Sequence, residues 1–231
     1  MFIQNSMTIL LEDLAIAVVD DNPAARGTMR EELEELGVKV DALAGPFLNK
    51  EAAFQALLQG NNQALVCDHH LNQHDYAQFN GAQFVAYCYG QRFPGVLVTR
   101  YSSDMLTEIR PLRHLIPALL TPRQLTDDVE HVQKIFDYCM REVLLGEFSP
   151  DRRPWQTLLR IENVDVDSRN VLVIIPAWDA PGGDNGIKIP FSMFPKHLWS
   201  ELKERARFFG MVNLGAEKHE DLYIKDITFR S

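Results

Sequence analysis

The stretches VVDDNPAAR at residues 18–26 and CDHHL at residues 67–71 decide the fold of the first part of the chain. In each stretch an apolar run ends directly in aspartate, as expected where a buried parallel strand reaches its carboxyl end. In the first stretch, Asn22 can cap a helix and Pro23 suits the first helical position. The pattern therefore predicts a strand, a sharp turn and a helix in succession.

Apolar runs and amphipathic segments continue to alternate through the first 145 residues. The predicted strands are 15–19, 38–44, 64–67, 95–99 and 116–120, and the predicted helices are 23–36, 51–59, 82–89, 103–115 and 126–144. Such alternation indicates right-handed crossovers and a parallel sheet that helices cover on both faces. We therefore predict an α/β domain with a five-stranded parallel (βα)5 sheet over residues 1–145.

Residues 146–154 break this pattern with glycine, proline and clustered charges, which is typical of a linker. Five stretches rich in β-branched and aromatic residues follow at 158–164, 171–177, 187–191, 208–214 and 222–229, with one predicted helix at 195–207. Several short strands with a single helix are typical of a curled sheet or small barrel. We therefore predict a second, mostly-β, barrel-like domain over residues 155–231.

Composition and charge narrow the possible functions. No apolar run approaches the roughly 20 residues that a bilayer requires, so we expect no membrane association. The net charge is −9, and the excess lies before residue 150, with 11 basic and 20 acidic residues against 12 and 12 afterwards. This balance disfavours nucleic acid as a partner of the first domain and leaves it open for residues 155–231. Three widely spaced cysteines indicate buried thiols and a cytoplasmic location.

Three carboxylates are predicted to meet at one edge of the parallel sheet. Asp20 and Asp21 end the first strand, Asp68 ends the third, and Thr99 places a hydroxyl at the end of the fourth. Ligands of open parallel sheets bind at this edge. Clustered carboxylates repel one another unless a cation holds them, and oxygen ligands favour Mg²⁺. The set suits phosphoryl transfer to an aspartate nucleophile.

Together with LVTR at 97–100 and LLTP at 119–122, these motifs make residues 12–144 resemble the receiver domain of two-component response regulators. The resemblance implies a flavodoxin-like fold. It implies that Asp68 is the phosphoacceptor and Thr99 the switch hydroxyl. It also implies a Mg²⁺ site made by Asp20, Asp21, Asp68 and the backbone carbonyl of His70.

The same resemblance implies partners and a role. A histidine kinase or phosphotransfer protein would phosphorylate Asp68, so the chain would be a phosphoacceptor rather than a turnover enzyme. The second domain lacks the length and the helix pairing of a winged helix, which favours output through protein–protein contacts over DNA. The protein partner of this β-domain is unknown, and the resemblance leaves a homodimer open.

Departures from the receiver pattern keep other interpretations open. Thr121 stands where receivers carry a lysine before proline, and a threonine can donate at most one neutral hydrogen bond to a phosphoryl oxygen. Arg100 stands where a small residue is usual, and residues 73–80 lengthen the loop after Asp68. One alternative is a pseudo-receiver scaffold without phosphotransfer, in a multi-protein or RNA-associated assembly. The CDHHL stretch also resembles the DHH motif of metallophosphoesterases, which gives a third interpretation.

Overall fold

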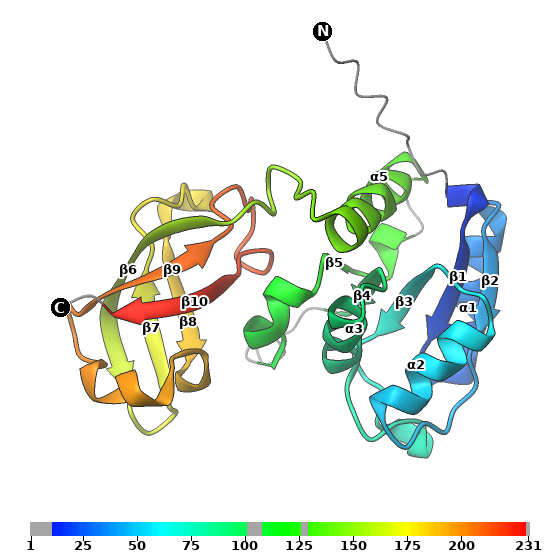
Figure 1. Ribbon diagram of the computed structural model, residues 1–231, viewed down its shortest axis with the longest axis horizontal. Helices are drawn as coiled ribbons and strands as arrows, with labels where there is room; N and C mark the ends of the chain where they lie inside the picture. The colour runs from blue at the N-terminus through cyan, green and yellow to red at the C-terminus, as the bar shows by residue number, and fades with distance from the viewer. Residues whose placement is uncertain (1–10, 101–107, 126–128, 230–231) are drawn as a thin grey trace, which may run out of the picture. The chain divides into compact units, whose positions relative to one another are not determined.

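The computed structural model describes residues 11–100, 108–125 and 129–229, and the chain divides into two compact units. Unit 1 comprises residues 1–100 and 115–147, and unit 2 comprises residues 101–114 and 148–231. Unit 2 therefore takes in two separate parts of the chain. The predicted domain bounds of 1–145 and 155–231 differ from this division, because they place residues 101–114 in the first domain. Figure 1 shows the helices and strands of each unit. Within the described residues, no helix is long and apolar enough to cross a membrane.

Unit 1 contains a parallel five-stranded sheet in the order β2-β1-β3-β4-β5, which confirms the predicted α/β fold. Its strands are β1 (Ala15–Val19), β2 (Lys39–Ala42), β3 (Ala64–Asp68), β4 (Gly95–Val98) and β5 (Ala118–Leu120). Its helices are α1 (Pro23–Glu35), α2 (Lys50–Gln59), α3 (Gly81–Gly90) and α5 (Val129–Met140), with the short helices η1 (Leu11–Asp13), η2 (Gln73–Asp75), η4 (Arg123–Leu125) and the π-helix η5 (Arg141–Leu145).

Helices cover both faces of this sheet (Figure 1). On one face, Leu33 of α1 and Phe136 of α5 belong to the same buried cluster as Val66 of β3. On the other face, Val85 of α3 and Leu65 of β3 both border Gly95. Since Leu65 and Val66 alternate along β3, their side chains point to opposite faces. This two-sided burial explains why the strands read as apolar runs.

The turn between β1 and α1 forms as the sequence predicts. The side chain of Asn22 accepts hydrogen bonds from the backbone N–H groups of Ala24 and Ala25, and Pro23 occupies the first turn. At the other end of α1, Gly37 has a φ of 82° and donates its N–H to the Glu34 carbonyl at 2.9 Å. The capped helix holds the turn that carries Asp20 and Asp21.

Two helices predicted within the first 145 residues are described only in part. Of the helix predicted over 103–115, residues 101–107 lie outside the described part of the chain, residues 108–109 are α-helical, and residues 110–115 form the 3₁₀-helix η3 (Arg110–Leu115). Pro111 accounts for the tighter last part, because proline lacks the N–H of an α-helical bond and clashes with the preceding turn. Of the helix predicted over 126–144, residues 126–128 also lie outside the described part.

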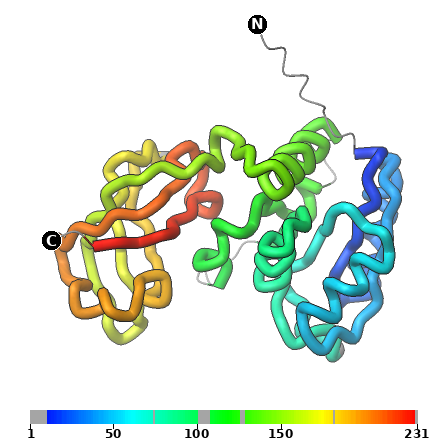
Figure 2. Tube along the Cα trace, viewed as in Figure 1, coloured from blue at the N-terminus to red at the C-terminus, as the bar shows by residue number. Residues whose placement is uncertain are grey.

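Unit 2 contains an antiparallel five-stranded sheet in the order β10-β9-β6-β7-β8, which confirms a mostly-β second domain. Its strands are β6 (Trp155–Asp165), β7 (Asn170–Ile174), β8 (Gly186–Pro190), β9 (Arg207–Val212) and β10 (Ile224–Phe229), with the 3₁₀-helices η6 (Pro181–Gly183), η7 (Phe191–Met193) and η8 (Lys196–Glu201). Figure 2 traces the chain through these strands. Among the described residues, β8 and β10 remain edge strands, so strand pairing does not close the expected barrel.

The helix predicted over 195–207 is shorter than expected and is a 3₁₀-helix, η8. The residues after it join the sheet instead. Arg205 donates its backbone N–H to the Ile161 carbonyl at 2.8 Å, and the Ile161 N–H donates to the Ala206 carbonyl at 2.9 Å. Sheet pairing with β6 and burial of Ala206 therefore override the helical spacing of the apolar residues.

Candidate functional site

The strand order places the ends of β1, β3 and β4 side by side at the carboxyl edge of the unit 1 sheet. Val19 pairs with Cys67, and Asp68 pairs with Val98. Asp20 therefore follows β1 beside Asp68, and Thr99 follows β4 on the other side of Asp68. Thr99 is buried, and its backbone N–H donates to the Leu120 carbonyl at 2.8 Å.

The ionised forms of Asp20 and Asp68 are destabilised at this edge of the sheet. Burial, and then the negative charge of Asp20, raise the pKa of Asp68 to about 6, although a 2.6 Å hydrogen bond from the His70 N–H opposes the shift. Burial also raises the pKa of Asp20, against a hydrogen bond from the Asn22 N–H, and Asp21 adds to this rise. The cluster therefore favours protonation or the arrival of a cation.

Asp21 ties the long loop after β3 to the turn after β1. Its Oδ2 accepts a 2.6 Å hydrogen bond from the backbone N–H of Gln73, in η2. Arg26 of α1 donates to the Asp20 carbonyl, and its guanidinium lies 5.4 Å from the centre of the Tyr76 ring. Gln73 and Tyr76, from the extra residues 73–80, therefore lie close to the turn that carries Asp20 and Asp21.

Gly81 fixes the distance between this loop and Asp68. Its N–H donates to the His69 carbonyl at 2.8 Å, and a Cβ at this position would lie 1.9 Å from the Asp68 backbone oxygen. Asn80 caps α3 through a reciprocal pair of hydrogen bonds with Gln83. Sequence reasoning missed this capping box, although asparagine followed three residues later by glutamine signals one.

The resemblance to receiver domains implies a magnesium ion, and the oxygen donors at this edge of the sheet suit it. Asp20 and Asp68 supply two mutually repelling carboxylates, and Mg²⁺ commonly keeps several of its waters while binding one or two carboxylates. Within the described residues, no group of three or more His, Cys, Asp or Glu side chains is arranged to hold a metal. The full set with Asp21 and the His70 carbonyl stays a prediction.

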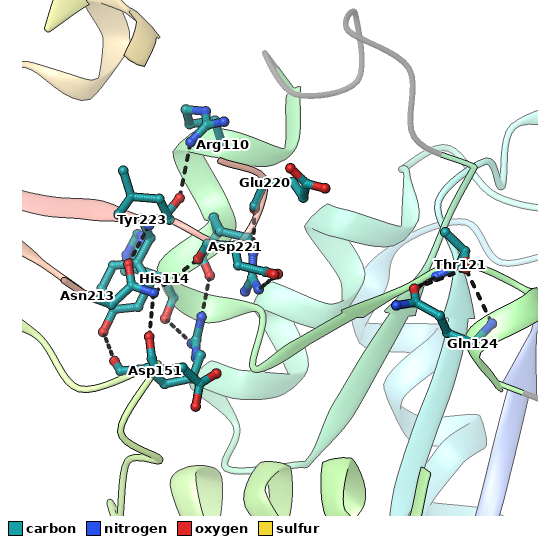
Figure 3. A network of polar contacts seen from close by, with 12 residues as sticks. Arg110, His114, Thr121, Gln124, Asp151, Asn213, Glu220, Asp221 and Tyr223 are labelled. Carbon is teal, nitrogen blue, oxygen red and sulfur yellow. Dashed lines mark hydrogen bonds and ion pairs between the residues drawn. The ribbon is translucent and has the colours of Figure 1, made fainter. Parts of the chain in front are cut away.

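Thr121 is engaged within its own turn. Its hydroxyl and its backbone N–H both donate to Oε1 of Gln124, at 3.0 and 2.8 Å, as Figure 3 shows. The Gln124 N–H in turn approaches the Thr121 hydroxyl at 3.3 Å. The position that holds a lysine in receivers therefore carries a neutral side chain that caps η4.

Solved structures of response regulators and receiver domains match this chain over more than half of its length. A response regulator from Thermotoga maritima in complex with Mg²⁺-BeF matches at 22% identity over 53% of this chain and 98% of its own, with a TM-score of 0.42. The signal receiver domain of an HD domain-containing protein from Pseudomonas fluorescens matches at 14% identity over 61% of this chain and 96% of its own, with a TM-score of 0.44. A response regulator receiver domain from Clostridium thermocellum matches at 10% identity over 58% and 99%, with a TM-score of 0.43.

Part of this chain is similar in fold to receiver domains. Comparison with protein-family models gives no match, and neither does comparison with curated proteins. The fold of this receiver-like unit follows from its strand order and from the helices on both faces of its sheet.

A second polar cluster surrounds η3, the part of the β4–β5 crossover that belongs to unit 2 (Figure 3). The Arg113 side chain donates to the Glu220 carbonyl at 3.1 Å and pairs with Asp221 at 2.9 Å. Arg110 donates to the Leu222 carbonyl at 3.1 Å, and Arg152 donates to the Arg113 carbonyl at 3.2 Å. These bonds fasten the crossover to the β9–β10 connection, residues 213–223.

Proposed function

We propose that this chain is a response-regulator-like signalling protein in which Asp68 accepts a phosphoryl group. The position of Asp68 carries the proposal: it lies at the end of the central strand, between Asp20 and the buried Thr99. A carboxylate there is partly exposed and faces a neighbouring negative charge. Asp20 and Asp68 would hold Mg²⁺, which supplies neutralisation of charge on the transferring group.

The chemical step is nucleophilic. One Asp68 oxygen attacks the phosphorus of a phosphohistidine or an acyl phosphate, and a new O–P bond forms. The donor's P–N or P–O bond breaks, and the leaving group keeps the electron pair. The donor in the cell would be a histidine kinase or a phosphotransfer protein. The Thr99 hydroxyl would then donate to a phosphoryl oxygen.

The proposed output runs through unit 2 and its protein contacts rather than through DNA. The chain that follows Thr99 reaches η3, which is hydrogen-bonded within unit 2. Under this proposal, a change at Thr99 would act on a segment that is hydrogen-bonded within unit 2. Two arrangements of this crossover, biased by phosphorylation, would constitute the switch.

Mass spectrometry after incubation with Mg²⁺ and acetyl phosphate tests the proposal. We expect a hydroxylamine-sensitive adduct of about 80 Da, the mass of one phosphoryl group replacing a proton. It should be lost in Asp68→Asn and kept in Asp167→Asn, an exposed aspartate of the β6–β7 turn. An adduct that persists in Asp68→Asn would refute the assignment of the phosphoacceptor.

A non-catalytic scaffold is the second candidate, and Thr121 is the observation that favours it. With the Thr121 hydroxyl bound to Gln124, no lysine ammonium stands at this position to pair with a phosphoryl oxygen. Calorimetry with Mg²⁺ distinguishes the two candidates. Binding near millimolar Mg²⁺ that Asp20→Asn abolishes supports phosphotransfer, whereas no binding supports the scaffold.

A further inference from the structure

The antiparallel sheet of unit 2 has one face packed into a core and one face without such a partner. Residues that point to the core, among them Leu159, Val173, Ile189 and Phe208, are buried. Their neighbours along each strand point to the opposite side, because successive side chains alternate. We call this opposite side the outer sheet face and define it by Leu158, Arg160, Leu172, Lys188, Arg207 and Phe209.

Cations outnumber carboxylates on the outer sheet face. Residues 150–231 carry 12 basic and 12 acidic side chains, yet Arg160, Lys188, Arg207 and Lys225 all lie on outer-face positions. Glu162 pairs with Arg160, Asp165 interacts electrostatically with Lys188, and Asp226 falls at the irregularity of β10. Four cations against these three carboxylates leave a small basic excess on the face, in a protein whose net charge is −9.

Arg160 and Arg207 stand directly opposite each other on β6 and β9, and both are exposed. Like charges in directly opposite positions destabilise a sheet. Arg160 has one partner, Glu162, at 3.3 Å, in a pair that is about half exposed on both sides. We expect this arrangement to lower stability, and a local rule broken without an evident structural gain is typical of a functional site.

Apolar side chains lie beside the arginine pair. Leu158 is opposite Phe209 in the adjoining row, and Leu172, which is 37% exposed, lies opposite Lys188. These side chains are aliphatic apart from one phenylalanine. Single-stranded nucleic acids need several aromatic platforms for stacking, so the composition favours a protein partner.

We propose that the outer sheet face binds an acidic protein segment whose carboxylates pair with Arg160 and Arg207 and whose apolar side chains cover Leu158 and Phe209. The inference rests on the proposed function and adds to it the chemistry of the output partner. Self-association through this face is disfavoured, since two basic faces would meet. Arginine forks bind carboxylates bidentately, which gives such a contact its orientation.

Fluorescence anisotropy on the full chain tests the proposal with three labelled probes: a 20-residue peptide of Asp and Glu interspersed with Leu and Phe, its Lys-for-acid counterpart, and a dT20 oligonucleotide. We expect the acidic peptide to bind most tightly. The double variant R160E/R207E should weaken this binding at least tenfold. The control K203E/K218E makes the same charge change at two exposed residues off the face and should weaken it less than threefold.

The single variant R207E supplies a second readout. It places opposite charges across β6 and β9, so it should raise the urea midpoint while it weakens peptide binding. Equal loss of binding in both double variants, no binding of the acidic peptide, or tighter binding of dT20 would overturn the proposal. Peptide binding that persists in Asp68→Asn, which cannot be phosphorylated at residue 68, separates this inference from the proposed phosphotransfer.

Discussion

Arg113 pairs with Asp221 at 2.9 Å, and the Arg113 side chain is almost fully buried while that of Asp221 is about one-third exposed. The pair joins η3, which interrupts unit 1 in the sequence, to the β9–β10 connection of unit 2. Tyr223 adds to this join, since its hydroxyl donates to the Arg152 carbonyl at 2.7 Å and its ring lies 4.8 Å from the Arg152 guanidinium. Unit 2 therefore includes a segment that lies in the sequence between two strands of unit 1.

Arg113→Ala should destabilise unit 2 by about 2–4 kcal/mol, because it leaves a partly buried carboxylate and the Glu220 carbonyl without their donor. Urea unfolding followed by tryptophan fluorescence measures this, since all three tryptophans lie in unit 2. Arg160→Ala is the matched control: its ion pair is exposed, and we expect a loss below about 0.5 kcal/mol. Equal losses would contradict the importance assigned to the buried pair.

Gly81→Ala should cost about 2 kcal/mol or more, since the new Cβ would overlap the Asp68 backbone oxygen and the backbone must shift. Gly90→Ala, in the same helix, meets nothing within 4 Å and should be neutral or stabilising by about 0.5 kcal/mol. Thermal unfolding of both variants checks the contrast. An unchanged melting temperature in Gly81→Ala would show that the loop after β3 does not depend on this close approach.

The raised pKa of Asp68 predicts a pH dependence of stability in EDTA. The unfolded carboxyl titrates near 3.8 and the folded one near 6, so the folded state binds more protons between these values. Stability should therefore fall as pH rises from 4 to 6, and the penalty should be complete above pH 6. Asp68→Asn removes the penalty and should stabilise the protein by about 1–2 kcal/mol at pH 7, after allowance for partial exposure.

Free energies of unfolding at pH 4.5 and pH 7 measure this effect. Asp167→Asn, on an exposed turn, should leave the profile unchanged. An Asp68→Asn variant with the same slope as the parent protein would place the titration elsewhere. With millimolar Mg²⁺ at pH 7, the parent protein should gain stability and the variant should gain less.

Thr121→Lys should strengthen phosphoryl binding, because an ammonium can form a charge-assisted hydrogen bond where the threonine hydroxyl is bound to Gln124. Such a bond is worth about 1.5–3 kcal/mol, so affinity for beryllofluoride with Mg²⁺ should rise about tenfold. Calorimetry measures the affinity, and Thr121→Val serves as the uncharged control. Equal affinities in the two variants would argue that residue 121 does not reach the phosphoryl group.

The sequence predicts the parallel sheet well because burial leaves a strong pattern. Ile16 and Val98 are fully buried in continuous apolar runs, and Asn22 with Pro23 marks the start of α1. Cys67, Cys88 and Cys139 are buried thiols, as predicted. Local chemistry of this kind can be seen in any single stretch of the chain.

Long-range pairing accounts for what the sequence does not predict. The apolar spacing of residues 195–207 suggests a helix, but the backbone at Arg205 and Ala206 pairs with Ile161 more than 40 residues away. Nothing near Arg110 or Arg113 indicates that their partners lie about 110 residues later. At the acidic edge, the roles of Asn80 and Gly81 depend on a loop whose path follows from tertiary contacts.

The placement of residues 108–114 in unit 2 also limits how the two units can be separated by recombination. In a two-part protein joined by one linker, either half can be recombined with new neighbours as a cassette. Here a cut after residue 147 would remove the β9–β10 connection that accepts hydrogen bonds from Arg110 and Arg113, and residues 148–231 alone would lack the helix η3 that donates them. Recombination of either half alone would therefore lose these hydrogen bonds.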